Sequence, residues 1–155
     1  MRHVVRVPVV LAAAALLVGC QASSSAAPSG GSGGTTVNVD LQEFAIVTAS
    51  STAPAGSVTF HVTNKGPDEV HEFVIIKTDL DAASLPTDGD GAVEEEADGL
   101  EVIDEVEDLA VDATHDLTVD LAAGSYVLIC NIVDSKDGQA EAHYKMGMRT
   151  GFTVE

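Results

Sequence analysis

The stretch Val58-Thr59-Phe60-His61-Val62 alternates apolar and polar side chains residue by residue. A period of two is typical of a β-strand that buries one face and leaves the other in water. The same alternation recurs at residues 37–41 and 117–121. The sequence therefore predicts strands with one solvated face in three separate parts of the chain.

Turn signals separate these strands. Pro54-Ala55-Gly56, Asn64-Lys65-Gly66-Pro67 and Ala122-Ala123-Gly124-Ser125 contain residue types that favour turns. The apolar runs at 70–76 and 126–132 do not alternate, which indicates more central strands. Several short strands joined by turns favour an all-β sandwich or barrel.

Residues 78–113 depart from this pattern. They include 14 acidic residues, among them Glu94-Glu95-Glu96, and no basic residue. We expect an acidic, solvated insertion before the last strands, with docking of a partner as the alternative role. Within it, residues 100–109 fit either a short helix or an edge strand.

The N-terminus has the layout of an export signal. Arg2 and Arg6 precede an apolar run at 7–18, which is short for a bilayer span. The run closes on Leu17-Val18-Gly19-Cys20, which resembles the bacterial lipobox and implies a lipid on Cys20 after cleavage; a plain signal peptide is the alternative. These features predict a lipoprotein signal peptide at 1–19.

The residues after the signal predict a spacer and then one domain. Residues 20–35 are rich in Gly and Ser and indicate a flexible linker, so the folded domain is expected at 36–155. Without residues 1–19 the chain keeps five basic residues against 25 acidic ones, a net charge of −20. Nucleic acid is a poor partner for such a charge.

The cysteine count draws attention to one thiol. The chain has two cysteines, and if Cys20 carries a lipid, Cys130 has no partner for an intramolecular disulfide. Outside the cytoplasm thiols usually form disulfides. A lone thiol there is explained either by burial as a small apolar residue or by coordination of a soft metal.

The C-terminal segment carries the pattern that points to a metal. A strand at 126–131 ends in Cys130-Asn131, His143-Tyr144-Lys145-Met146-Gly147-Met148 follows, and a closing strand is expected at 149–155. This order resembles the C-terminal copper loop of the cupredoxins. Val70-His71-Glu72-Phe73-Val74 is similar to the strand that supplies the first histidine in that family.

The resemblance covers residues 36–155 and implies a Greek-key β-sandwich that holds one copper ion in a type 1 site. The implied ligands are His71, Cys130, His143 and Met148. Two imidazoles, a thiolate and a weak axial thioether form the trigonal set that suits copper. Taken alone, His71 fits a ligand and a core residue equally well, Cys130 and Met148 fit packing, and His143 fits a loop histidine without an assigned role.

The chain departs from the common pattern of the family in the copper loop. Cys130 and His143 are thirteen positions apart, where many relatives have three to five, so the polar residues 134–141 are expected as an excursion above the site. Asp134 or Glu141 would then lie near the metal. Asn131, Met146 and Glu141 are the candidates for alternative ligands or for contacts to the ligands.

Met148 is preferred to Met146 as the axial ligand. In the family the methionine usually lies five residues after the loop histidine and follows a glycine, and Met148 meets both conditions. His61 and His115 match no ligand position, and we expect both on the surface.

The implied function is outer-sphere electron transfer at the cell envelope, and not an enzymatic reaction. The electron is expected to pass through a solvent-facing edge of His143. An acidic, membrane-anchored carrier on the extracytoplasmic face would meet a redox partner with a basic surface, such as a cytochrome or oxidase domain. The alternatives are copper storage or delivery, and a metal-free β-sandwich interaction module.

Overall fold

The computed structural model describes residues 34–136 and 138–155. The predicted signal peptide, Cys20 and nearly all of the predicted linker lie outside the described residues. The elements are β1 (Thr35–Gln42), β2 (Ala45–Thr48), β3 (Thr52–Ala53), β4 (Gly56–Asn64), β5 (His71–Lys77), β6 (Glu101–Leu109), β7 (Thr114–Leu121), β8 (Gly124–Ile129), β9 (Val133–Lys136), β10 (Gln139–Ala142), α1 (His143–Met146) and β11 (Arg149–Val154). Within this described part no helix is long and apolar enough to cross a membrane.

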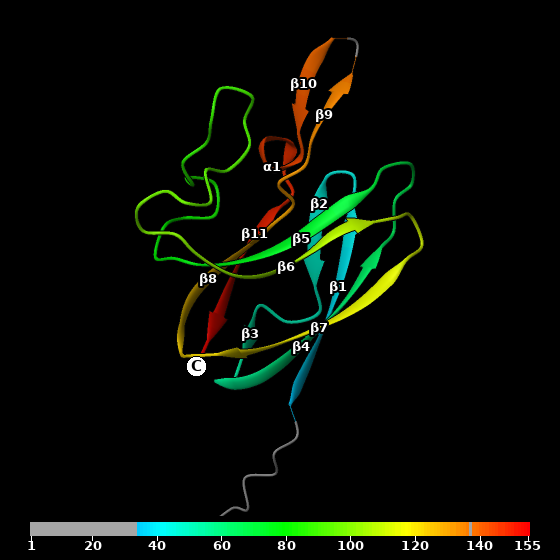
Figure 1. Ribbon diagram of the computed structural model, residues 1–155. Helices are drawn as coiled ribbons and strands as arrows, with labels where there is room; N and C mark the ends of the chain where they lie inside the picture. Colours follow the sequence, from blue (N-terminus) through cyan, green and yellow to red (C-terminus); the bar gives the residue numbers. More distant parts are fainter. Residues whose placement is uncertain (1–33, 137) are drawn as a thin grey trace, which may run out of the picture. The chain divides into compact units, whose positions relative to one another are not determined.

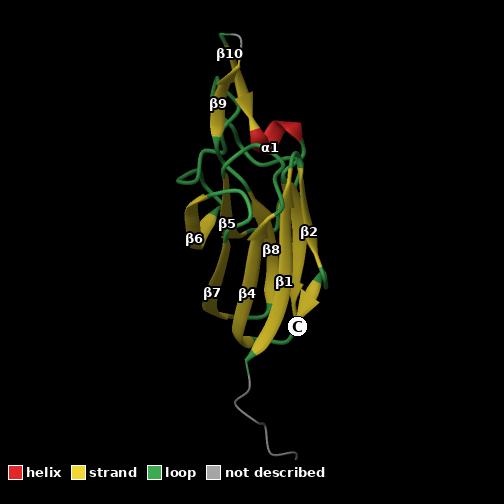
Figure 2. Cartoon of the chain, turned by 90° about the vertical axis from the view of Figure 1, so that its right-hand side faces the viewer, coloured by secondary structure: helices red, strands yellow, loops and turns green. Residues whose placement is uncertain are grey.

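Two mixed sheets form the domain (Figures 1 and 2). The first has the strand order β2-β1-β4-β7, and the second has the order β3-β11-β8-β5-β6. Strands β1 and β4 run parallel, as do β11 and β3, and the other paired strands are antiparallel. The predicted all-β sandwich is confirmed, and the alternating stretches at 37–41, 58–62 and 117–121 lie in β1, β4 and β7.

Aromatic rings join the two sheets across the core. The ring of Phe60, on β4, lies 5.4 Å from the ring of Phe73, on β5, measured between centroids. It lies 5.4 Å from the ring of Phe152, on β11. All three side chains are at most 2% exposed. The inward residues of the alternating strands therefore form the layer that holds the sandwich together.

The second sheet is also covered on its outer face, which corrects the expectation for residues 78–113. Leu85 and Val93, from the acidic segment, are buried in a second apolar cluster on that face. The other buried members of the cluster are Val74, Ile76, Val127, Ile129 and Tyr144. The segment is thus a lid over β5 and β8 and not only a solvated excursion. Burial on both faces also explains why these two strands read as continuous apolar runs.

Strand β6 resolves the alternative for residues 100–109 in favour of an edge strand. It pairs with β5 alone and forms one border of the second sheet. All five of its acidic residues are exposed. Charged side chains on an edge strand discourage pairing with another chain.

The long interval between Cys130 and His143 is taken up by a hairpin. Strands β9 and β10 pair antiparallel from Val133 opposite Ala142 to Lys136 opposite Gln139. The hairpin projects from the end of the sandwich, beside α1 (Figures 1 and 2). Its two strands leave and return at the same place, so the additional residues do not separate Cys130 from His143 in space.

Candidate metal centre

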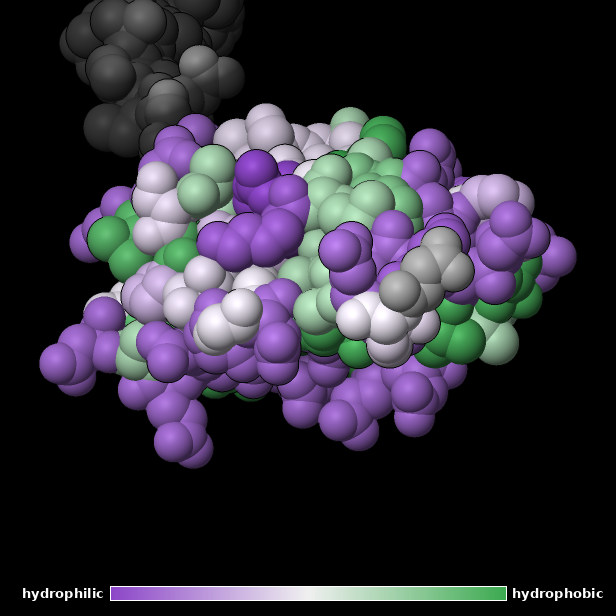
Figure 3. All heavy atoms as spheres, turned by 90° about the horizontal axis from the view of Figure 1, so that it is seen from above, coloured by the Kyte–Doolittle hydropathy of each residue, from purple (hydrophilic) through white to green (hydrophobic). Residues whose placement is uncertain are grey.

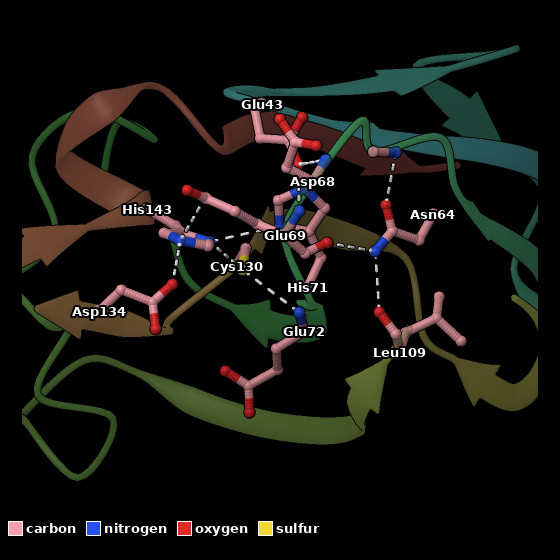
Figure 4. A network of polar contacts seen from close by, with 11 residues as sticks. Glu43, Asn64, Asp68, Glu69, His71, Glu72, Leu109, Cys130, Asp134 and His143 are labelled. Atoms are coloured by element: carbon pink, nitrogen blue, oxygen red, sulfur yellow. Dashed lines mark hydrogen bonds and ion pairs between the residues drawn. The ribbon is translucent and has the colours of Figure 1, made fainter. Parts of the chain in front are cut away.

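Three potential donor atoms converge at the end of the second sheet (Figure 4). His71 is the first residue of β5, Cys130 directly follows β8, and His143 is the first residue of α1. The Nδ1 atoms of the two histidines are 3.3 Å apart, and the Sγ of Cys130 lies 3.4 Å from Nδ1 of His143. One donor atom from each residue lies within 4.8 Å of the others. All three side chains are fully buried.

Backbone hydrogen bonds hold the loop that carries these donors. The N–H of His143 donates to the carbonyl of Ile132 at 2.9 Å, which closes the base of the β9–β10 hairpin. The N–H of Met148 donates to the carbonyl of His143 at 3.0 Å, and that of Cys130 donates to the carbonyl of Met148 at 3.1 Å. The backbone thus links Cys130, His143 and Met148 directly.

The two methionines lie in different environments. Met148 is fully buried in the core cluster that also contains Cys130. Met146 is 44% exposed on α1 and borders a surface hollow with Glu141. The preference for Met148 over Met146 as the axial ligand stays a prediction, and the burial of Met148 beside Cys130 is consistent with it.

Gly147 allows the turn between the two methionines to approach the first sheet. Its φ is 132°, in the region that favours glycine, and a Cβ there would lie 2.8 Å from the carbonyl oxygen of Phe44. The ring of Phe44 meets the ring of His143 edge-on, with 5.1 Å between centroids. The β1–β2 turn therefore packs directly against the ligand loop.

The side chains of Asn131 and Glu141 make their polar contacts with residues other than the three donors. The Oδ1 of Asn131 accepts a hydrogen bond from the N–H of Val93 at 2.6 Å, and its Nδ2 donates to Glu95 at 2.8 Å. Asn131 therefore ties the end of β8 to the acidic segment. Glu141 lies on β10 with its carboxylate 3.8 Å from Nζ of Lys136.

Burial controls the ionisation of the donor residues. Burial raises the pKa of the Cys130 thiol to about 11, although hydrogen bonds from backbone amides oppose the shift; one comes from the N–H of Glu72 at 3.2 Å. Burial and the neighbouring His143 lower the pKa of His71, while the charge of Glu43 opposes them. A neutral imidazole is the form that ligates a metal. Burial, with the charge of Glu105, also raises the pKa of Glu72 to about 7.

Carboxylates face the outer nitrogens of both histidines. Nε2 of His143 lies 3.2 Å from Oδ2 of Asp134 and 3.2 Å from Oε2 of Glu69. Nε2 of His71 lies 3.7 Å from Oε1 of Glu43. The sequence pointed to Asp134 but missed Glu43 and Glu69. Glu69 lies two residues before His71, whereas Glu43 is brought in from a distant turn without any local signal.

The prediction that His143 has a solvent-facing edge is wrong, because this side chain has no exposed surface. The hairpin and the loop before β5 bring Asp134 and Glu69 next to the ring. Asp134 was expected near the site, and Glu69 was not. His61 and His115 lie on the first sheet, away from the donors. His61 pairs with Asp116 across β4 and β7 with 45% of its side chain exposed, and His115 is also exposed.

No family model matches the chain, and no curated protein does. Solved structures do resemble it. Dithionite-reduced auracyanin from Roseiflexus castenholzii aligns with a TM-score of 0.54 at 22% identity, over 78% of this chain and 97% of its own. Auracyanin A, a "blue" copper protein from Chloroflexus aurantiacus, aligns with a TM-score of 0.50 at 20% identity, over 79% of this chain and 100% of its own. Rusticyanin from Thiobacillus ferrooxidans aligns with a TM-score of 0.51 at 16% identity, over 79% of each chain. At these identities the likeness shows a shared fold.

Proposed function

We propose that this chain, which has the cupredoxin fold, binds one copper ion and carries single electrons. The observation that carries the proposal is the convergence of two imidazole nitrogens and one thiol, fully buried and within 4.8 Å of one another. A buried cluster of three such groups without a shared ligand would leave polar atoms poorly partnered. Nε2 of His71 has no hydrogen-bond partner among the described residues.

The donor set fits copper in particular. His71, Cys130 and His143 would supply two nitrogens and one sulfur, and the buried Met148 would supply a weak thioether. This combination is the one that blue-copper electron-transfer sites use, and zinc gains little from a thioether. Copper bound there would supply a centre that accepts and returns one electron.

The chain's own residues fix the positions of the donors and exclude water from them. The donors stand on β5, on the end of β8 and on α1, and hydrogen bonds from Cys130 and Met148 tie the ligand loop to the sheet. Full burial keeps water from the donor atoms. Because the Cys130 pKa is raised to about 11, the thiol holds its proton at neutral pH until a metal replaces it.

The proposal places the protein at the cell envelope. The export signal at 1–19 and a lipid on Cys20 would hold it at the extracytoplasmic face of the cell membrane. Its high negative charge would steer a basic redox partner, such as a cytochrome or oxidase domain, at a rate that falls with salt. Electron exchange of this kind makes or breaks no bond in a substrate, so the protein would not be an enzyme.

The end of the domain that carries the ligand loop is the surface on which a partner would dock. Figure 3 looks onto this end and shows hydrophilic residues around a more hydrophobic area. Val70 and Met146, which lie near the two ligand histidines in the sequence, are 42% and 44% exposed. Phe44 is partly exposed and touches the His143 ring. It offers a short route for an electron to the surface, since His143 itself is covered.

Copper delivery is the second candidate function, and the exposed Met146 favours it. A thioether at the surface is a soft ligand suited to cuprous ion. The two functions differ in reversibility: an electron carrier gives reversible voltammetry with copper retained through both states, whereas a delivery protein releases copper to an acceptor after reduction.

Cys130→Ser tests the donor set. We expect the copper-loaded wild type to show an intense thiolate-to-copper absorption band, and we expect the variant to lose that band completely. The substitution is nearly isosteric, so circular dichroism of the apo variant should match that of the apo wild type. The measurement is visible absorption and paramagnetic resonance after one equivalent of cupric ion. A wild type without a thiolate band would refute the proposed copper site.

Met148→Leu tests the axial position. The weak axial bond should not be needed for uptake, so copper should still bind while its reduction potential shifts. Met146→Leu is the matched control, because its side chain is exposed, and it should leave the potential unchanged. The opposite result in the two variants would reassign the axial ligand to Met146.

A further inference from the structure

The ring of His143 has two different environments on its two nitrogens. Nδ1 faces the Sγ of Cys130 at 3.4 Å and the Nδ1 of His71 at 3.3 Å. Nε2 lies 3.2 Å from Oδ2 of Asp134, with which it forms a hydrogen bond. It also lies 3.2 Å from Oε2 of Glu69, a buried oxygen that has no hydrogen-bond partner among the described residues. The ring is fully buried. A buried N–H needs an acceptor, and a ligating nitrogen must be free of hydrogen.

The two carboxylates reach the ring from separate elements (Figure 4). Asp134 lies on β9, in the hairpin that lengthens the interval between Cys130 and His143. Glu69 lies in the loop before β5. Its N–H donates to Oε1 of Glu43 at 2.7 Å, and its carbonyl accepts a hydrogen bond from Nδ2 of Asn64 at 2.8 Å. Because Asn64 is fully buried, the backbone position of Glu69 is well defined.

A carboxylate acceptor on the far nitrogen acts on a metal through the histidine. It holds the ring orientation and the tautomer, and it makes the imidazole a stronger donor. A stronger imidazole donor, together with the negative charge of the carboxylate next to it, favours the more highly charged state of a bound ion. Asp134 is 51% exposed and Glu69 is 21% exposed, so water weakens the effect without removing it.

We propose that Asp134 and Glu69 are positioning residues. The hydrogen bond to Asp134 holds His143 with its hydrogen on Nε2 and Nδ1 toward the metal, the charge of Glu69 favours the same arrangement, and both carboxylates lower the reduction potential. This inference rests on the proposed copper site. It assigns to the β9–β10 hairpin a role in the chemistry of the site, because the hairpin carries Asp134, the carboxylate that forms the hydrogen bond with Nε2 of His143.

The test uses the full chain with Asp134→Asn, Glu69→Gln and both together. Asp68→Asn is the matched control. Asp68 borders the same surface hollow as Glu69 and Asp134, but among the described residues it forms no hydrogen bond or ion pair with either histidine ring. The measurements are the midpoint potential of the copper-loaded protein and its affinities for cupric and cuprous ion by chelator competition.

We expect the double variant to shift the ratio of cupric to cuprous affinity at least tenfold toward cuprous ion, which is a rise of about 59 mV for one electron. Each single variant should give a smaller rise in the same direction. The control should shift the ratio less than threefold. The inference would be overturned if the double variant shifted the affinity ratio no further than Asp68→Asn does. If the double variant does not fold, the same comparison is made with either single variant.

A second measurement does not depend on copper. Long-range proton–nitrogen correlation spectra of the apo protein should show the His143 hydrogen on Nε2 in the wild type and a mixture of tautomers in Asp134→Asn. A wild-type ring with hydrogen on Nδ1 would overturn the inference. If this result holds while the wild type shows no thiolate band, the positioning of His143 stands and the proposed copper function fails.

Discussion

The two sheets of the sandwich share one core but differ on their outer faces. On the first sheet, polar pairs such as Thr59 with Thr118 lie across β4 and β7 in contact with water. On the second sheet, the acidic segment covers Val74, Ile76, Val127 and Ile129. The three donor residues of the candidate metal centre all lie on the second sheet or on the loop that follows it. A site that must exclude water and keep its geometry stands on the sheet that is buried on both faces.

Phe60→Ala should have the largest effect on stability, because this side chain joins both sheets. Removing a buried aromatic side chain costs about 3–5 kcal/mol in free energy of unfolding. Denaturant unfolding of the apo protein measures the change. Thr59→Ala, on the solvated face of the same strand, is the control and should cost far less; equal losses would show that the shared core does not dominate.

Leu85→Ala tests the cover of the second sheet and should have an intermediate effect. Leu85 is 4% exposed against β5 and β8, and its loss should cost about 2 kcal/mol, the low end for a buried leucine, because a loop can collapse into the space. Leu80→Ala is the matched control, since Leu80 is 42% exposed in the same segment. If both changes cost the same, the acidic segment is not a packed cover.

His61→Ala should have the smallest effect, below about 0.5 kcal/mol, because exposed ion pairs contribute little. His61 pairs with Asp116 on the solvated face of the first sheet. The same denaturant unfolding measures stability, and the copper spectrum should not change. A large loss of stability, or any change in the thiolate band, would show that the outer face of the first sheet is coupled to the candidate metal centre.

Several features were predictable because they are encoded locally. The alternating stretches around Phe60 and Leu117 predicted strands with one buried face. The order of His71, Cys130, His143 and Met148 predicted which residue types would meet, and the structure brings the first three donors together. A period of two depends on one strand alone. Three of the four ligand candidates lie in one segment at 130–148, and His71 was added by the resemblance to the cupredoxins, so neither prediction required knowledge of the tertiary contacts.

Other features were not predictable because they depend on long-range packing. The acidic segment looked solvated since its apolar residues are sparse, and only the exposed apolar face of β5 and β8 gives Leu85 and Val93 something to cover. The carboxylates that face Nε2 of His143 and of His71 come from β9, from the loop before β5 and from the β1–β2 turn. No local pattern marks Glu43 or Glu69 as their neighbours.

The sequence by itself determined the class of fold, the acidic charge and the candidate donor residues, since strand period, composition and residue order are properties of the chain. Only the tertiary structure decided that the donors are fully buried, that one sheet is buried on both faces, and that carboxylates face Nε2 of both histidines. Burial and electrostatics depend on which segments meet in space, and the sandwich brings together residues that lie far apart along the chain.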